Sequence, residues 1–102
     1  MEEFKISIVT PSLNQGNYIE DAIQSVLNQN YKNFEHIIID GLSTDKTIEI
    51  LKKYKHLKWI SEKDEGQSDA INKGFQRCTG DIMAWLNADD YYIKDTFNVV
   101  NN

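Results

Sequence analysis

The chain has 102 residues, enough for one small domain around a single core. Its formal net charge is -5, and no cluster of Lys and Arg is visible, so we expect no nucleic-acid partner. A single cysteine, Cys78, excludes an internal disulfide and fits a reducing compartment. The N-terminus does not resemble a signal peptide, and no apolar run is long enough to span a bilayer. We therefore expect a cytoplasmic location.

Apolar runs alternate with segments of helical spacing along the whole chain. The apolar runs predict strands at 6–9, 34–39, 57–60 and 82–86, the last of them buried. Helical spacing predicts helices at 18–28 with Asn17 as N-cap, from Thr44 or Asp45 to Tyr54, at 68–78 and at 92–100. This order predicts one domain with a three-layer α/β/α architecture and a mostly parallel sheet of right-handed βαβ units.

Polar side chains gather where the predicted strands end. They are Thr10, Asn14, Asp40, Ser43, Glu62, Asp64, Asn87, Asp89 and Asp90. In a parallel sheet these ends share one edge, where ligands bind in open α/β folds. Asp40 can accept a hydrogen bond from the base or sugar of a ligand, and Asp89 with Asp90 can hold a divalent cation beside a phosphate. The alternative is that these residues only shape turns.

Other ligand-binding patterns are missing from the sequence. There is no Gly-x-Gly-x-x-Gly after the first strand and no Gly-x-x-x-x-Gly-Lys-Ser/Thr, which disfavours a dinucleotide-binding Rossmann site and a P-loop. A metal is then the more favoured way to hold a phosphate. His36 and His56 have no partners at metal-ligand spacing, and we interpret both as packing or surface residues.

Four motifs in order resemble those of a known family. They are Ile8-Val9-Thr10-Pro11-Ser12-Leu13-Asn14, the run from Ile37 to Thr47, the run from Asp64 to Gly74, and the run from Gly80 to Asp90. Together they cover nearly the whole chain and resemble the N-terminal half of a family 2 glycosyltransferase with the GT-A fold. We predict the strand order 3-2-1-4 of a Rossmann-like half-domain, because the first and fourth strands must be neighbours to bring Thr10, Asp40 and Asp89 around one crevice.

The resemblance implies a nucleotide-diphosphate-sugar site, with a UDP-sugar as the expected donor. Asp40 resembles the acid that binds uracil, and Asp69 with Lys73 resembles residues facing the donor, although an exposed i, i+4 ion pair is an equal alternative. The implied nucleotide-binding residues are Thr10, Pro11, Asn14, Asp40, Ser43, Asp64, Asp69, Lys73, Asn87 and Ala88.

The resemblance also implies a metal site. Asn87-Ala88-Asp89 matches the Asp-x-Asp motif of the family, with Asn in place of the first acid. Asn87 keeps an acceptor oxygen for a ribose hydroxyl but loses a charge. Asp89 and Asp90 are the implied ligands of Mn²⁺ or Mg²⁺.

The implied reaction is an inverting, metal-dependent transfer of a sugar to a saccharide or related acceptor, as in polysaccharide biosynthesis. The acceptor half of the family and its base lie beyond the matched region, so no catalytic residue is assigned. We expect the 102-residue chain to bind donor without transferring sugar and to self-associate as a homo-oligomer. Membrane association of the full-length enzyme is compatible with the resemblance.

Two other readings compete with the enzyme. The first is a non-enzymatic nucleotide-binding or assembly module with the same fold. The second is an α/β receiver domain, which also clusters acids at strand ends. A receiver would need an acidic pair directly after the first strand, where this chain carries Thr10-Pro11-Ser12.

Overall fold

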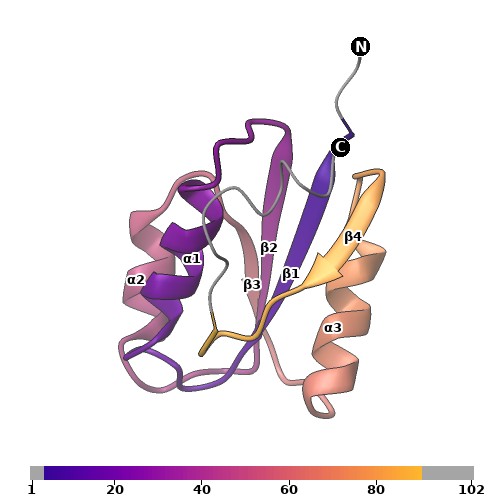
Figure 1. Ribbon diagram of the computed structural model, residues 1–102. Coiled ribbons are helices and arrows are strands. Elements are labelled where there is room, and N and C mark those ends of the chain that lie inside the picture. The colour runs from indigo at the N-terminus through magenta and orange to yellow at the C-terminus, as the bar shows by residue number, and fades with distance from the viewer. Residues whose placement is uncertain (1–3, 91–102) are drawn as a thin grey trace.

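Strands and helices alternate along the chain in the computed structural model, which describes residues 4–90. The predicted helix over 92–100 lies outside the described residues. The elements are β1 (Ile6–Ser12), α1 (Ile19–Leu27), β2 (Phe34–Asp40), α2 (Thr47–Lys53), β3 (Lys58–Ser61), α3 (Gln67–Gln76) and β4 (Ile82–Trp85) (Figure 1).

The four strands form one parallel sheet in the order β3-β2-β1-β4, which confirms the predicted order. Ile6 of β1 lies opposite both Phe34 of β2 and Ile82 of β4. Because all strands run the same way, their carboxyl ends meet at one edge of the sheet. The end of β1 lies in the middle of that edge, between β2 and β4.

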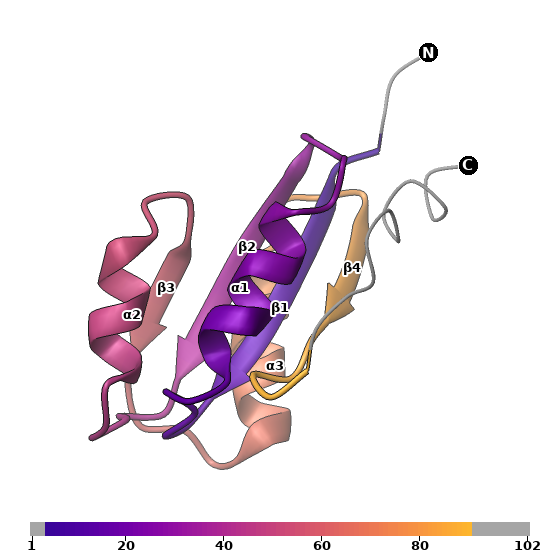
Figure 2. The ribbon, with the colours of Figure 1, turned by 60° about the vertical axis from the view of Figure 1, so that its left-hand side comes forward.

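Helices cover both faces of the sheet, with α1 and α2 on one face and α3 on the other (Figures 1 and 2). Ile38 of β2 packs in a cluster with Ile19 of α1 and Leu51 of α2, whereas its neighbours Ile37 and Ile39 pack with α3. Alternate β2 side chains therefore enter opposite cores, which is why this strand reads as a continuous apolar run. No helix within residues 4–90 is long and apolar enough to cross a membrane.

The first strand is longer than predicted and continues through Pro11 to Ser12. Its partner on one side is β2, which it follows to the register Ser12↔Asp40. On the other side the carbonyl of Val9 accepts a hydrogen bond from Leu86, just where β4 has ended. The nitrogen of Pro11 faces the same side as Val9 and has no strand beside it. Pro11 therefore extends β1 without the loss of a ladder hydrogen bond.

The helix starts also differ from the prediction. The cap position of α1 is Tyr18 instead of Asn17, and no side chain caps this helix. For α2 the cap position is Lys46, and Asp45 contributes from one residue earlier by accepting hydrogen bonds from the N–H and hydroxyl of Thr47. The predicted capping by Asn17 was wrong, and Asp45 acts close to its predicted place.

The fourth strand is an edge strand with one open face, and its predicted burial was wrong. Ile82 and Ala84 pack against the core beneath α1. Met83 and Trp85 are 56% and 54% exposed. The reason is their register: they lie opposite Ser7 and Val9 on the α3 face, and α3 packs over β1 and β2.

A buried carboxylate joins several elements at the opposite end of the sheet. Glu35 of β2 accepts hydrogen bonds from the Ser7 hydroxyl, the Lys58 ammonium and the Thr79 backbone N–H. Burial by itself would raise the pKa of Glu35, but hydrogen bonds from Lys58, Ser7 and Thr79 outweigh it and lower that pKa to about 2. The ionised Glu35 side chain of β2 thus connects β1, β3 and the turn before β4 through hydrogen bonds.

Helix α3 packs tightly against Val9 of β1 at Gly74, and we expect Gly74→Ala to destabilise the fold. A Cβ at this position would lie 2.2 Å from Cγ1 of Val9, which is fully buried. The clash should cost about 1–3 kcal/mol, although alanine is the better helix former by about 1 kcal/mol. Urea denaturation measures the change. In a Val9→Ala background both Cγ atoms are gone and only the Cβ of residue 9 remains, 3.1 Å from the added methyl, so the cost of Gly74→Ala should be much smaller. Wild-type stability of the single variant would contradict this packing.

Candidate functional site

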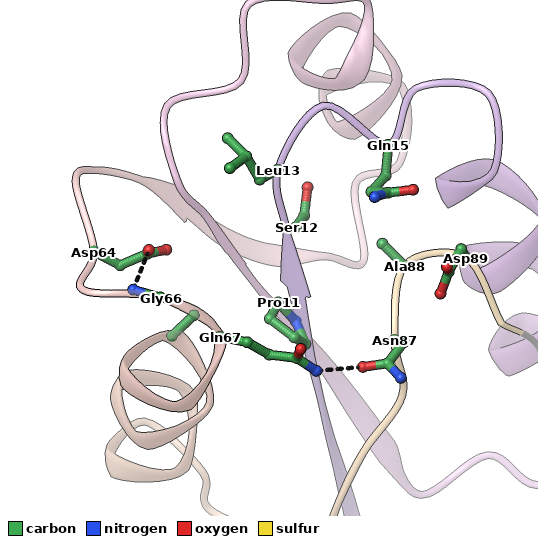
Figure 3. Close-up of a pocket in the computed structure, with 11 residues that line it drawn as sticks. Pro11, Ser12, Leu13, Gln15, Asp64, Gly66, Gln67, Asn87, Ala88 and Asp89 are labelled. Carbon is green, nitrogen blue, oxygen red and sulfur yellow. Dashed lines mark hydrogen bonds between the residues drawn. The ribbon is translucent and has the colours of Figure 1, made fainter.

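A cleft lies at the carboxyl edge of the sheet, between the ends of β1 and β4 and the start of α3 (Figure 3). Its volume is about 320 Å³, the lower end of the usual size for small-molecule sites. Its lining residues are Pro11, Ser12, Leu13, Gln15, Asp64, Gly66, Gln67, Ala70, Asn87, Ala88 and Asp89. The crevice beyond parallel strand ends is where open α/β sheets bind ligands.

Asp89 stands on the β4 side of the cleft with its carboxylate uncommitted. It is exposed and forms no hydrogen bond or ion pair with any residue of the described range 4–90. No group of three metal-ligating side chains occurs in that range. Mg²⁺ and similar hard cations are commonly held by one or two carboxylates together with substrate phosphates and water. A cleft carboxylate without a protein partner in the described range therefore fits a cation that a phosphorylated ligand shares.

Asp90, the second implied metal ligand, does not line the cleft. Its backbone N–H donates to the Asn87 carbonyl at 3.0 Å and closes a tight turn. This turn presents Asp89 to the cleft. The other predicted residue of the turn, Ala88, is buried and packs against the α1–α2 core while also lining the cleft.

Asn87 is linked across the cleft to a residue that the sequence did not single out. The Nε2 group of Gln67, at the start of α3, donates to Oδ1 of Asn87 at 2.7 Å (Figure 3). The acceptor oxygen expected to meet a ribose hydroxyl is thus already engaged by a protein donor.

Asp64 lies in the cleft as predicted and is held by the turn before α3. Its Oδ1 accepts a hydrogen bond from the Gly66 N–H at 3.0 Å (Figure 3). Its Oδ2 lies over Gly41, where an added Cβ would be 2.8 Å away. The absence of a side chain at Gly41 makes room for this carboxylate.

Asp40 is fully buried beside the cleft. One oxygen accepts hydrogen bonds from the hydroxyls of Ser12 and Ser43, and the other from the Ser61 hydroxyl and the Ser43 N–H, all at 2.5–2.8 Å. The carboxylate expected to contact a nucleotide base is therefore directed at serines in this structure. Through Ser12, which lines the cleft, it fixes the cleft wall.

Thr10 also lies inside the protein. It is fully buried, and its hydroxyl is 2.7 Å from Nε2 of His36, which is equally buried. Nδ1 of His36 has no hydrogen-bond partner among the described residues. Burial, assisted by the nearby charge of His56, lowers the pKa of His36 to about 3. The Thr10 hydroxyl does not line the cleft, whereas its neighbours Pro11 and Ser12 do.

Asn14 and Ser43 join two loops instead of lining the cleft. Asn14 has a positive φ of 52° and directs its Oδ1 at the backbone N–H groups of Thr44 and Asp45. The Asn14 N–H in turn donates to the Ser43 hydroxyl, and the Gly16 N–H donates to Asp45. The loop after β1 is thereby fastened to the loop after β2. We call this set of bonds the loop latch.

Asp69 and Lys73 form the i, i+4 ion pair that was the alternative to donor contact, at 3.5 Å. Lys73 also reaches Glu62 at 3.4 Å and donates to the Lys63 carbonyl at 2.8 Å. A hydrogen bond from the Glu65 N–H, assisted by Lys73, lowers the pKa of Asp69. Neither residue lines the cleft, and the pair fastens α3 to the loop before it.

The cleft thus contains five of the predicted residues, which are Pro11, Asp64, Asn87, Ala88 and Asp89. Prediction from sequence missed Ser12, Leu13, Gln15, Gly66, Gln67 and Ala70. Two signals were available for them. Ser12 and Leu13 directly follow Pro11 within the first motif, and Gln67 lies inside the third.

Comparison with protein families and curated proteins gives consistent matches. The profile described as Glycosyl transferase family 2 matches residues 7–100. An uncharacterized glycosyltransferase of Rickettsia conorii is 40% identical over 97% of this chain, and the match covers 17% of that protein. A putative teichuronic acid biosynthesis glycosyltransferase of Bacillus subtilis, TuaG, is 40% identical over 88% of this chain and 38% of its own length. The chain thus spans well under half the length of these relatives.

Solved structures share the fold. TarS residues 1–349 of S. aureus in complex with UDP-GlcNAc matches with a TM-score of 0.89 and 27% identity, over 94% of this chain and 30% of that one. A mannosyltransferase of Pyrobaculum calidifontis in complex with GDP-Man and Mn²⁺ matches with a TM-score of 0.87 and 21% identity, over 99% of this chain and 32% of that one. These likenesses confirm the α/β half of the GT-A fold. With its profile match over residues 7–100, the chain belongs to glycosyl transferase family 2.

Proposed function

We propose that the cleft binds the nucleoside diphosphate of a sugar donor, and that the chain is the donor-binding part of a glycosyltransferase. The observation that carries the proposal is the position of an uncommitted carboxylate, Asp89, in a cleft at the carboxyl edge of the sheet. Support for a UDP-sugar comes from the likeness to TarS, which was solved with UDP-GlcNAc and with UDP. In this assignment Pro11, Ser12 and Asp64 face the nucleoside.

We place a divalent cation, Mn²⁺ or Mg²⁺, at Asp89. When bound, such an ion neutralises charge on the diphosphate as it leaves. Within residues 4–90 the cleft contributes two carboxylates, Asp64 and Asp89. The first is tied to the Gly66 N–H and the second is not. This difference supports placing the cation at Asp89, with Asp64 left to accept hydrogen bonds.

The proposed reaction is an inverting transfer to a carbohydrate acceptor. A base removes the proton of an acceptor hydroxyl, whose oxygen bonds to the anomeric carbon as the bond to the diphosphate oxygen breaks. The likeness to a protein named for teichuronic acid biosynthesis supports a polysaccharide as the acceptor class. The donor-binding residues of this chain hold the nucleotide and orient its diphosphate in that step.

Calorimetric titration with UDP, with and without Mn²⁺, tests the assignment. Wild type should bind UDP more tightly with Mn²⁺, and Asp89→Ala should remove that increment, because a charged interaction of this kind contributes about 1.5–3 kcal/mol. Asp90→Ala is the matched control, since its side chain lies outside the cleft and the same charge is removed.

Two results would overturn parts of the proposal. If wild type binds neither UDP nor GDP, the cleft is not a nucleotide site. If Asp90→Ala removes the Mn²⁺ increment and Asp89→Ala keeps it, the cation is held by the other carboxylate of the turn.

A further inference from the structure

A hydrogen bond between two side chains links the walls of the cleft. Gln67, the first residue of α3, donates from Nε2 to Oδ1 of Asn87 on the loop after β4, at 2.7 Å (Figure 3). Both residues are exposed. A hydrogen bond contributes only about 0.5–1.5 kcal/mol to folding, and exposure to water leaves this one at the low end. Its main effect is therefore on the direction of the Asn87 amide.

That direction decides what Asn87 offers to a ligand. A primary amide has one acceptor oxygen and one NH₂ group with two donors. Because Oδ1 receives the proton of Gln67, the Nδ2 group is the part of the Asn87 amide that has no partner within residues 4–90. An aspartate at position 87 would accept from Gln67 equally well, but its second oxygen would be a charged acceptor. With Asn87 held by Gln67, position 87 offers a ligand a hydrogen-bond donor, whereas an aspartate there would offer an acceptor.

We propose that Gln67 is a positioning residue that makes position 87 a hydrogen-bond donor to an oxygen of the bound nucleoside diphosphate. This inference rests on the proposed function of the cleft. Asn87 and Asp89 are two residues apart on the same side of the cleft. An amide donor and a cation at Asp89 then act on the same anionic group, so the nucleotide keeps part of its affinity when the cation is removed.

A double-mutant cycle on the whole 102-residue chain tests the inference, with UDP titrated in the absence of metal. Gln67→Glu supplies only acceptors, so the Asn87 amide must turn its Nδ2 toward position 67 and its oxygen toward the ligand. We expect the Kd of UDP to rise about tenfold, the value of one hydrogen bond. Ser68→Glu is the matched control, because it adds the same charge one residue further along the same exposed helical turn. Its effect should be less than threefold.

The cycle is closed by Asn87→Ala. If Gln67 acts through Asn87, then Gln67→Glu raises the Kd of UDP less in the Asn87→Ala background than in wild type, because only the direct repulsion between the new cleft-lining charge and UDP remains there. Asn87→Asp should weaken metal-free binding while enlarging the increment from Mn²⁺, because it exchanges a donor for a charge beside Asp89. Neither pattern would follow from a merely structural role, and thermal unfolding midpoints of all variants should stay close to that of wild type.

Side-chain NMR gives a direct measurement. The Asn87 NH₂ signals, assigned by their loss in Asn87→Ala, should shift on addition of UDP without metal. A full effect of Gln67→Glu in the Asn87→Ala background, or NH₂ signals that do not respond to bound UDP, would overturn this inference alone. Failure of wild type to bind any nucleoside diphosphate would overturn the proposed function as well.

Discussion

Asp40→Ala is expected to lower the free energy of unfolding by about 3–5 kcal/mol, because it removes the common acceptor of hydrogen bonds from Ser12, Ser43 and Ser61. The carboxylate is fully buried and accepts hydrogen bonds from Ser12, Ser43 and Ser61. Its removal leaves the buried Ser12 hydroxyl and the half-buried hydroxyls of Ser43 and Ser61 without this acceptor, and each buried unsatisfied group costs about 1–3 kcal/mol. Chemical denaturation monitored by circular dichroism measures the change.

Ser61→Ala provides the matched control, because it removes one of the hydroxyls and leaves the carboxylate with its other donors. We expect it to cost about 1 kcal/mol. A direct base contact by Asp40 would give a different result: Asp40→Ala would weaken UDP binding while the unfolding midpoint stayed unchanged. That outcome would contradict the buried arrangement of Asp40 in the free protein.

Acidification is expected to destabilise the fold well above the pH at which carboxylates titrate. Burial and the nearby charge of His56 lower the pKa of His36 from 6.5 in the unfolded chain to about 3. Below about pH 6.5 the unfolded state therefore binds a proton that the native state does not. The contribution of neutral His36 is present above pH 6.5 and is lost as the pH falls toward 3, at about 1.4 kcal/mol per pH unit.

Urea denaturation at a series of pH values measures this slope. His36→Gln cannot take up a proton, so its stability should vary less between about pH 6.5 and 4.5 than that of wild type. His56→Gln is the comparison variant: burial also lowers the pKa of His56, but this residue is only half-buried, so the flattening should be smaller. Equal slopes for wild type and His36→Gln would contradict the buried neutral imidazole.

Glu35 acts in a separate and lower pH range. Its pKa of about 2 lies below the value of 4.5 in the unfolded chain, so its stabilising effect is present above about pH 4.5 and is lost as the pH falls through 2. Measurements above pH 4.5 therefore report the histidines, and the range below it adds Glu35.

The fold was readable from sequence because its signals are local and mutually consistent. Continuous apolar runs such as that of β2 indicate strands buried on both sides, and short polar connections favour parallel crossovers. Two features depended on tertiary context. Pro11 continues β1 because β4 ends beside Val9, and Trp85 is exposed because α3 packs over other strands. A local sequence pattern shows neither which strand lies beside another nor which strands a helix covers.

The site was predicted to the level of loops but less well to the level of side chains. Sequence order placed Asp40, Asp64 and Asp89 at one sheet edge. It did not show that Asp40 is enclosed by serines while Asp89 stays uncommitted. Ser12 and Ser61 lie beside Asp40 because of the register of β1, β2 and β3. Tertiary structure therefore determines whether an acidic side chain is bonded within the protein or is available to a ligand.

The two sides of the cleft differ in how much conformational freedom they are expected to lose when a ligand binds. Through the loop latch, Asn14 and Gly16 of the first loop are already bonded to Thr44 and Asp45 of the second. A nucleotide that meets this side loses little affinity to the freezing of backbone motion. On the other side, within residues 4–90, Gln67 reaches across the cleft with a side-chain hydrogen bond to Asn87, the residue before the Ala88–Asp89 turn. The loss of conformational entropy on binding should therefore occur mainly on the β4 side, where we propose that the diphosphate binds.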